Sequence, residues 1–317
     1  MSDSLNALIH TLRYEAEDIT SIELRPVGGG SFPAFAAGSH IDLHLPNGMV
    51  RSYSLVNPSS ETQRYVVAVL KDRASRGGSR WVHEQLRPGQ TLRLTGPRNH
   101  FRLNEAAPRF ALVAGGIGVT PVLAMARRLA ALGRPVRMFY AVRSRAAAAF
   151  LAELQALVPD LTLHADDEAG GPPDLAAWLA TLPRDTGAYC CGPAPMLDGF
   201  ESSCAALGLA DAHIERFAAA PAPADAPVTG ACLVECRRSG QTVSVPAGTS
   251  ILNALLAAGI DMPYSCTEGI CGTCETRVLD GEVDHRDGVL SAAERAAGQV
   301  MMVCVSGGKG PRLVLDV

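Results

Sequence analysis

Short runs of alternating apolar and polar residues dominate the first hundred positions of the chain. Successive side chains of a β-strand point to opposite faces, so such alternation predicts strands that are buried on one side. The predicted strands are Ile19–Arg25, His40–Leu45, Val50–Val56, Tyr65–Lys71 and Thr91–Thr95. Pro46, Asn47 and Gly48 give a hairpin signal between two of them. We therefore expect residues 1–103 to form a small antiparallel β-barrel domain.

From residue 104 the pattern changes to buried strands that alternate with helical segments. Phe110–Ala114 and Ala188–Cys191 are short apolar runs, whereas Pro121–Leu132 and Ala194–Leu207 have helical length. A further helix is predicted over residues 146–158. Alternation of this kind predicts a parallel α/β domain over residues 104–219.

A linker and a third pattern follow. Residues 220–229 contain three prolines, a composition that predicts an extended connection. Beyond it, a hairpin, a helix over Ser250–Ala258 and a cysteine-rich loop predict a small α+β domain over residues 230–317, of the β-grasp ferredoxin type.

Composition narrows the class of protein. The chain has 317 residues, of which 47% are hydrophobic and 19% charged, as expected for a soluble protein of two or three domains. A net charge of −4 gives no reason to expect nucleic acid or a membrane surface as a partner. No segment resembles a secretory signal or a transmembrane helix, so a cytoplasmic location is expected. In that reducing compartment, nine cysteines favour metal or redox chemistry over disulfides.

Four of the cysteines have the spacing of an iron–sulfur site. Cys266, Cys271, Cys274 and Cys304 form a C-x4-C-x2-C…C array, which is the pattern that holds a plant-type [2Fe–2S] cluster. The fourth cysteine is expected on a strand over Met301–Val305. Zinc is the alternative, but structural zinc sites usually combine two short Cys or His pairs, and only one is present here.

Two segments of the first domain carry groups that suit a flavin. On one predicted strand, Arg51 offers a guanidinium for a phosphate, Tyr53 an aromatic ring and Ser54 a hydroxyl. About twenty residues later comes a second candidate, made of Arg76, Gly77, Gly78 and Ser79. It precedes a helical stretch, and the free N–H groups at a helix start bind anions. Ordinary surface pairing and a serine-capped turn are the alternatives, but together the segments favour a flavin phosphate site.

A glycine-rich segment joins the first strand and helix of the α/β domain. Gly116 and Gly118 would let a pyrophosphate approach the backbone, and Thr120 is a suitable N-cap. A tight strand-to-helix turn is the alternative. The segment is not a G-x-G-x-x-G fingerprint, and Arg143 and Arg145, rather than an acidic residue, follow the second strand.

The last predicted parallel strand ends at Cys191, Gly192 and Pro193. Ligands bind at this carboxyl edge in open α/β sheets, so Cys191 is a candidate to contact a nicotinamide. The other cysteines are predicted to be core residues, and His285 is predicted to be a surface loop histidine.

Taken together, the chain resembles the phthalate dioxygenase reductase family, which includes vanillate O-demethylase reductases and belongs to the ferredoxin–NADP reductase superfamily. The resemblance covers essentially the whole chain. The segments that carry it are RSYSL (51–55), RGGS (76–79), GPRNHF (96–101), GGIGVTP (115–121), YCCGP (189–193), IERF (214–217), CTEGICGTC (266–274), DHRD (284–287) and MMVCVS (301–306).

The resemblance implies FMN, a [2Fe–2S] cluster and NADH as cofactors. It places Tyr53, Ser54 and Phe217 beside the flavin ring, with Ser54 and Cys191 as catalytic residues. The nicotinamide nucleotide site is implied to consist of Gly116, Gly118, Thr120, Arg143, Cys191, Gly192 and Pro193. The two arginines after the second strand leave NADPH open.

The implied function is that of a reductase component. A nicotinamide releases two electrons as a hydride, whereas a cluster accepts one at a time, so a flavin is needed between them. The implied partner is a Rieske-type non-haem iron oxygenase that acts on an aromatic or similar small acid. A free-standing NAD(P)H diaphorase or flavin reductase is the second hypothesis, and an iron–sulfur storage or binding module is the third.

Overall fold

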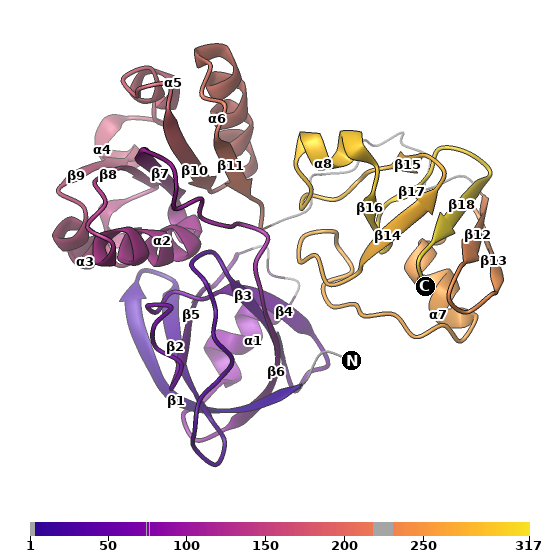
Figure 1. Cartoon of the computed structure of the whole chain (residues 1–317). Helices are drawn as coiled ribbons and strands as arrows, with labels where there is room; N and C mark the ends of the chain where they lie inside the picture. Colours follow the sequence, from indigo (N-terminus) through magenta and orange to yellow (C-terminus); the bar gives the residue numbers. More distant parts are fainter. Residues whose placement is uncertain (1–3, 74, 76, 218–230) are drawn as a thin grey trace. The chain divides into compact units, whose positions relative to one another are not determined.

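The computed structural model of the chain describes residues 4–73, 75, 77–217 and 231–317. Arg76 of the predicted phosphate loop and the predicted linker 220–229 lie outside these residues. The chain divides into two compact units, 2–217 and 218–317, and each is considered by itself (Figure 1). No helix of the described residues is long and apolar enough to cross a membrane.

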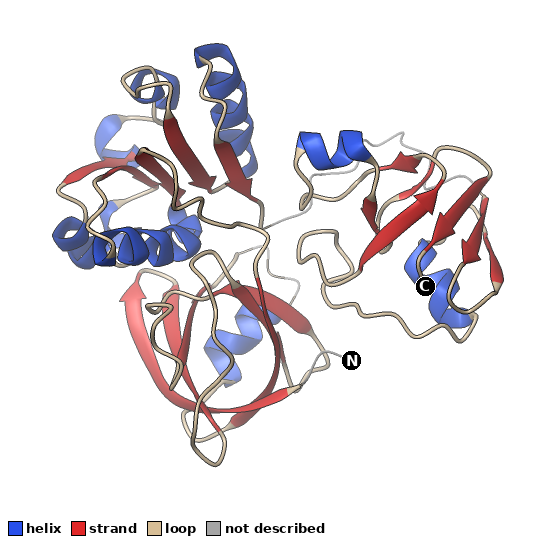
Figure 2. Ribbon diagram, viewed as in Figure 1, coloured by secondary structure: helices blue, strands red, loops and turns tan. Residues whose placement is uncertain are grey.

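The first part of unit 2–217 is a six-stranded antiparallel barrel in the order β4-β3-β6-β1-β2-β5. A bridge between Leu55 and Val67 brings the two edge strands together, and α1 (Gly78–Gln85) covers one end (Figure 2). The strands are β1 (Leu5–Ala16), β2 (Ile19–Pro26), β3 (His40–His44), β4 (Val50–Ser54), β5 (Tyr65–Leu70) and β6 (Thr91–Arg98).

Strand β1 was not predicted, although it is the longest in the barrel at 12 residues. Its pairing with β2 shifts register between Ile9 and Thr11 and again between Tyr14 and Ala16. Each bulge inserts a residue and reverses the faces of those that follow, so simple alternation is lost.

The second part of this unit is a five-stranded parallel sheet in the order β11-β10-β7-β8-β9. Its strands are β7 (Arg109–Gly115), β8 (Val136–Val142), β9 (Asp160–Ala165), β10 (Thr186–Cys191) and β11 (Ala212–Glu215). The order reverses between β7 and β10, which is where open α/β sheets bind ligands. Its helices are α2 (Val119–Ala131), α3 (Leu151–Leu157), α4 (Asp166–Ala169), α5 (Leu175–Leu179) and α6 (Ala194–Leu207).

Alternate residues of β7 pack on opposite faces of the sheet. Leu112 and Ala114 join the core beneath α2, whereas Ala111 and Val113 join the core beneath α5 and α6. The helix predicted over 146–158 is wrong in its first part, because α3 begins only after Phe150, which has φ 59°. Left-handed backbone at a residue other than glycine interrupts a helix.

One arginine ties the barrel to the α/β part. The Arg127 guanidinium on α2 donates to the carbonyl of Val56 in the barrel and pairs with Glu153 on α3 at 2.7 and 2.8 Å. Because only 18% of this side chain is exposed, the contact fixes the segment that follows β4 relative to the parallel sheet.

The second unit has a five-stranded mixed sheet in the order β13-β12-β18-β14-β16, in which β12 and β18 run parallel. Its elements are β12 (Cys232–Cys236), β13 (Thr242–Val245), α7 (Ile251–Ala257), β14 (Glu275–Asp280), β15 (Val283–Asp284), α8 (Ala292–Ala297), β16 (Val300–Met302), β17 (Gly307–Gly308) and β18 (Arg312–Leu315). The strand predicted over Met301–Val305 is wrong beyond Met302. Cys304 lies in a turn closed by the N–H of Val305 donating to the Met302 carbonyl at 3.1 Å.

Candidate functional site

The predicted phosphate site of the barrel is built on β4 and the start of α1. A Cβ atom added to Gly78 would lie 2.6 Å from Nε of Arg51, so a larger residue would displace this guanidinium from its present position. Gly77 has φ 107°, and an added Cβ would lie 2.9 Å from Cε of Met49. Arg51 donates to the Val50 carbonyl at 2.9 Å and to Sδ of Met49 at 3.7 Å, and its side chain lies against Gly78 at the positive end of an eight-residue helix. Two sources of positive potential therefore meet at one point, which suits a phosphate.

Ser75, which was not predicted, organises this loop. Its Oγ accepts from the N–H of Gly77 at 3.1 Å, from the N–H of Arg80 at 3.3 Å and from the Ser79 hydroxyl at 3.0 Å. Ser79, predicted to bind phosphate, also accepts from the N–H of Asp72 at 3.2 Å. Both hydroxyls thus stabilise the conformation of the loop. The role of Ser75 could have been predicted from its position next to the glycine-rich run.

Three polar groups meet where β4, β10 and β11 end. Ser54 is 4% exposed and Cys191 is fully buried, and Cys191 pairs with Glu215 in the parallel register of β10 and β11. Neither Ser54 Oγ nor Glu215 Oε2 has a hydrogen-bond partner of normal geometry among the described residues. Buried polar atoms without partners are costly, so this junction suits a ligand with hydrogen-bonding atoms, such as a flavin or nicotinamide ring.

Glu215 is the site residue that sequence reasoning missed, although its segment was quoted for the resemblance. The residue as a whole is partly exposed, but its Oε2 is closed off from solvent. Burial raises the pKa of this carboxyl to about 8, and the nearby Ser54 hydroxyl opposes the shift only in part. Burial, with the Glu215 charge second, also raises the pKa of the Cys191 thiol well above its usual range. Both groups are therefore protonated at neutral pH and can donate a hydrogen bond.

The raised pKa of Glu215 predicts a pH dependence of stability. The folded state retains a proton between the ordinary pKa near 4.5 and about 8, so stability falls as pH rises through this window. Glu215→Gln should remove the effect. Urea unfolding of this unit should show the variant equal to the native protein at about pH 5 and more stable by roughly 2 kcal/mol at about pH 9, a value reduced for the partial exposure. Glu17→Gln, at an exposed position, is the control; equal curves for Glu215→Gln and native protein at both pH values would contradict the assignment.

The glycine-rich turn after β7 packs backbone to backbone against the end of β10. A Cβ atom on Gly118 would lie 2.2 Å from the Cys191 carbonyl oxygen, and one on Gly115 would lie 2.7 Å from Cδ of Pro193. Gly116 has φ 52° and open space around it. The predicted residues of both strands therefore do meet, at the point where the strand order reverses.

The N-cap role predicted for Thr120 is wrong. Helix α2 begins at Val119, and the Thr120 hydroxyl is buried and donates to the Ile117 carbonyl at 3.0 Å. A short 3-10 turn over Gly116–Gly118 precedes the helix, which starts two residues earlier than predicted, with Gly118 in the N-cap position.

The remaining predicted residues of this unit differ in their burial and contacts. Tyr53 packs against the barrel core, and burial raises its pKa to about 12. Phe217 is 40% exposed at the end of the described range. Arg143 is exposed at the end of β8, and Arg145 pairs with Glu168.

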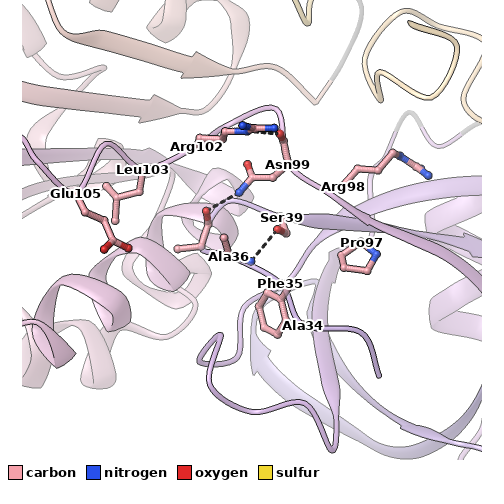
Figure 3. A pocket seen from close by; sticks show the side chains of 11 residues that line it. Ala34, Phe35, Ala36, Ser39, Pro97, Arg98, Asn99, Arg102, Leu103 and Glu105 are labelled. Atoms are coloured by element: carbon pink, nitrogen blue, oxygen red, sulfur yellow. Dashed lines mark hydrogen bonds between the residues drawn. The ribbon is translucent and has the colours of Figure 1, made fainter. Parts of the chain in front are cut away.

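A hollow of about 400 Å³ on the barrel is not part of this site. It is lined by residues of the segments 34–39 and 97–105, and Figure 3 shows the Ser39 hydroxyl accepting from the N–H of Ala36. None of the predicted flavin or nicotinamide residues lines it. The candidate site for the flavin and nicotinamide rings lies instead where β4, β10 and β11 end.

In the second unit the four predicted cysteines form two pairs. The thiols of Cys266 and Cys271 contact each other, as do those of Cys274 and Cys304. Each contact lowers the pKa of one thiol, that of Cys271 or Cys304, and raises the pKa of its partner, Cys266 or Cys274, so one sulfur of each pair is favoured as the thiolate form that binds iron. Two pairs of cysteine sulfurs suit a cluster of two irons.

The loop around these cysteines directs hydrogen-bond donors to sulfur. The N–H of Glu268 donates to Sγ of Cys266 at 3.3 Å, and the Thr273 hydroxyl lies 3.2 Å from Sγ of Cys271. Gly269 has φ 70°, and an added Cβ would lie 2.5 Å from Cγ2 of Val305. Hydrogen bonds to the sulfurs are one of the means by which proteins tune an iron–sulfur cluster, so the loop fits one.

Zinc fits this site less well. Among the described residues, no group of three or more His, Cys, Asp or Glu side chains could hold a single metal ion. A structural zinc ion needs four such ligands around one point, whereas the cysteines here are arranged two by two.

The prediction of a surface histidine at position 285 is wrong. The His285 side chain is 9% exposed, and both ring nitrogens are buried without a hydrogen-bond partner in the described part of the chain. Neighbouring Asp287 accepts from the N–H groups of Val289 and Leu290, at 3.1 and 2.8 Å. The charged residues of the DHRD segment suggested an exposed loop, whereas they form a folded loop with internal hydrogen bonds.

Two domain families match the sequence. The 2Fe-2S iron-sulfur cluster binding domain matches residues 234–307, and the oxidoreductase NAD-binding domain matches residues 112–167. All four paired cysteines lie in the first of these ranges.

Two curated relatives match over almost the whole chain. Phenoxybenzoate dioxygenase subunit beta of Ectopseudomonas oleovorans is 47% identical over 98% of this chain and 96% of its own length. Tetrachlorobenzoquinone reductase of Sphingobium chlorophenolicum is 48% identical over 95% of this chain and 94% of its own.

Two solved structures match over almost the whole chain. An intact type IV self-sufficient cytochrome P450 monooxygenase matches with a TM-score of 0.92 and 42% identity over 99% of this chain, which spans 41% of that structure. Phthalate dioxygenase reductase matches with a TM-score of 0.72 and 37% identity over 99% of this chain and 98% of its own.

These likenesses confirm the predicted fold class of barrel, parallel α/β domain and [2Fe–2S] ferredoxin domain. They also confirm two of the predicted cofactors, a [2Fe–2S] cluster and a nicotinamide nucleotide, while FMN stays a prediction. The chain belongs to the phthalate dioxygenase reductase family of electron-transfer oxidoreductases.

Proposed function

We propose that this protein is the reductase component of a Rieske-type oxygenase system and transfers electrons from NADH through FMN and the [2Fe–2S] cluster to the oxygenase. The observation that carries the proposal is that one chain combines the strand-end junction of Ser54, Cys191 and Glu215 with two pairs of cysteines in a separate unit. Relatives named as oxygenase subunits support the choice of acceptor.

The residues divide the task. Bound FMN would accept two electrons and release them singly, and the bound cluster would carry one at a time. Arg51 and the start of α1 would hold the flavin phosphate, while the junction would present protonated Glu215 and the Ser54 hydroxyl to the ring. The turn at Gly116–Gly118 would receive the coenzyme pyrophosphate. Cys266, Cys271, Cys274 and Cys304 would hold the irons. Since the reaction consumes NADH, we place the protein in the cytoplasm.

Anaerobic titration with NADH tests the route. We expect the flavin absorbance to bleach and a reduced [2Fe–2S] signal to appear in the electron paramagnetic resonance spectrum, with oxygenase reduction following when that partner is added. A flavin that bleaches while the cluster stays oxidised would contradict the route. If the reduced protein transfers electrons to no Rieske-type oxygenase that acts on an aromatic acid, the proposed partner is wrong.

A second candidate function is the reduction of a quinone. The relative named tetrachlorobenzoquinone reductase is 48% identical over 95% of this chain, which favours a small organic acceptor. Steady-state rates with a benzoquinone and with the oxygenase, measured on one preparation, separate the two. A kcat/KM for the quinone that exceeds that for every oxygenase tested would favour the second function.

Arg51→Ala should weaken flavin binding. A charge-assisted contact with a phosphate contributes about 1.5–3 kcal/mol, so FMN affinity should fall roughly tenfold to a hundredfold. Fluorescence titration of the flavin-free protein with FMN measures it. Arg13→Ala, at an exposed arginine of β1, should bind FMN normally. Undiminished FMN affinity in Arg51→Ala, or FAD as the flavin extracted from native protein, would overturn the assignment of the phosphate site.

A further inference from the structure

Opposite charges face each other where β8 and β9 end. These strands are parallel neighbours, so Arg143 and Arg145 after β8 lie beside Asp166–Glu168 after β9. The Arg145 guanidinium donates to both carboxylate oxygens of Glu168, from Nε at 2.9 Å and from Nη2 at 2.8 Å. The N–H of Asp167 donates to the Arg143 carbonyl at 3.1 Å, which fixes the two turns against each other.

This edge is where the two nicotinamide coenzymes differ. In a dinucleotide domain, the residues after the second strand meet the adenosine ribose, whose 2′ position carries a hydroxyl in NADH and a phosphate in NADPH. Free arginines there would favour the phosphate. The inference below rests on the proposed use of a nicotinamide coenzyme by this domain.

The arginines here are not equally free. Both oxygens of Glu168 engage Arg145, in the bidentate geometry that a phosphate would also use. The cluster of two arginines and three carboxylates has a formal balance of −1, although Asp166 also lies 3.3 Å from His164. A 2′-phosphate would therefore meet a net negative edge and would have to displace a carboxylate.

We propose that Glu168 is a positioning residue for coenzyme specificity: by holding Arg145, it denies NADPH a phosphate contact and makes NADH the preferred coenzyme. Without this carboxylate, Arg145 becomes available and the local charge changes from −1 to neutral. Two arginines would then face the ribose from the end of β8.

Glu168→Gln tests the proposal, because it keeps the side-chain shape and removes the charge. The native protein should have a higher kcat/KM with NADH than with NADPH. In the variant, the ratio of kcat/KM for NADPH to that for NADH should rise about tenfold, since one charge-assisted phosphate contact is gained. Calorimetric titration should show 2′,5′-ADP binding about tenfold tighter than in native protein, with 5′-AMP unchanged.

Two further variants make the test specific. Asp160→Asn breaks another Arg–carboxylate pair between the same strands, that of Arg137 and Asp160 at 2.9 Å, but at their opposite end. It should leave the coenzyme ratio unchanged. Arg145→Ala should change the ratio less than twofold alone, yet abolish the gain when combined with Glu168→Gln.

The outcomes separate the inference from the function on which it rests. An unchanged ratio and unchanged 2′,5′-ADP affinity in Glu168→Gln, with normal NADH turnover, would overturn the inference alone. So would an equal gain in Asp160→Asn, or native protein that prefers NADPH. If native protein accepts electrons from neither coenzyme, the proposed function itself fails.

Discussion

Cys271→Ser should separate the two halves of the electron route. NADH-dependent reduction of ferricyanide should continue at close to the native rate, while reduction of cytochrome c or the oxygenase should fall at least a hundredfold. Serine is a poorer iron ligand than a thiolate, and Cys271 is 1% exposed within a tight loop that offers no replacement among its neighbours. The visible and paramagnetic spectra should lose the [2Fe–2S] signals, while FMN remains bound.

The matched control for this variant is Cys236→Ala. Cys236 is 2% exposed in the core of the same unit and belongs to neither cysteine pair, so its removal should leave the cluster and acceptor reduction intact. If Cys271→Ser reduces its protein acceptor at the native rate, electrons leave from the flavin and the cluster is not the relay.

Gly118→Ala should have the second large effect. A Cβ atom would lie 2.2 Å from the Cys191 carbonyl oxygen and 2.8 Å from the Gly192 nitrogen, so the turn after β7 must move away from the end of β10. Overpacking of this kind costs about 1–3 kcal/mol of stability. Because this backbone contact shapes the proposed nicotinamide site, kcat/KM for NADH should fall roughly a hundredfold, with FMN still bound.

Gly199→Ala provides the control. This glycine is exposed on α6, and an added Cβ would meet no atom within 4 Å. Alanine should therefore stabilise the helix by about 0.5–1 kcal/mol without changing turnover. Native NADH kinetics in Gly118→Ala would show that the turn does not shape the coenzyme site.

Features set by local spacing could be predicted from the sequence. Cys266, Cys271 and Cys274 lie within nine residues, so they are close in any fold, whereas Cys304 comes from a turn 30 positions further along the chain. Strands β7 and β10 and helices α2 and α6 of the α/β part could be predicted because each has its own unbroken apolar period, whereas β11 and α4 were not predicted. The early start expected for α3 failed at Phe150, where the backbone conformation is set by packing against the core rather than by helix propensity.

The features that were missed depend on distant neighbours. Glu215 becomes unusual only because β11 places it beside Cys191, whose carbonyl in turn abuts Gly118. The engagement of Arg145 depends on Glu168, which follows a different strand. Likewise, the burial of His285 could not be predicted from the residues next to it in the sequence. In each case the environment of the residue is determined by a contact with another element, and the local sequence pattern does not predict such contacts.

The place of β18 in its sheet has a consequence for how the cluster unit is made. This strand comprises Arg312–Leu315, the last in the chain, yet it is the central one, with β12 on one side and β14 on the other. A ribosome delivers the N-terminal barrel first and this strand last. The sheet therefore cannot close until β18, which follows all four cysteines in the sequence, has emerged from the ribosome. We expect iron and sulfide to be incorporated after that point, when the flavin-binding unit has already had time to fold.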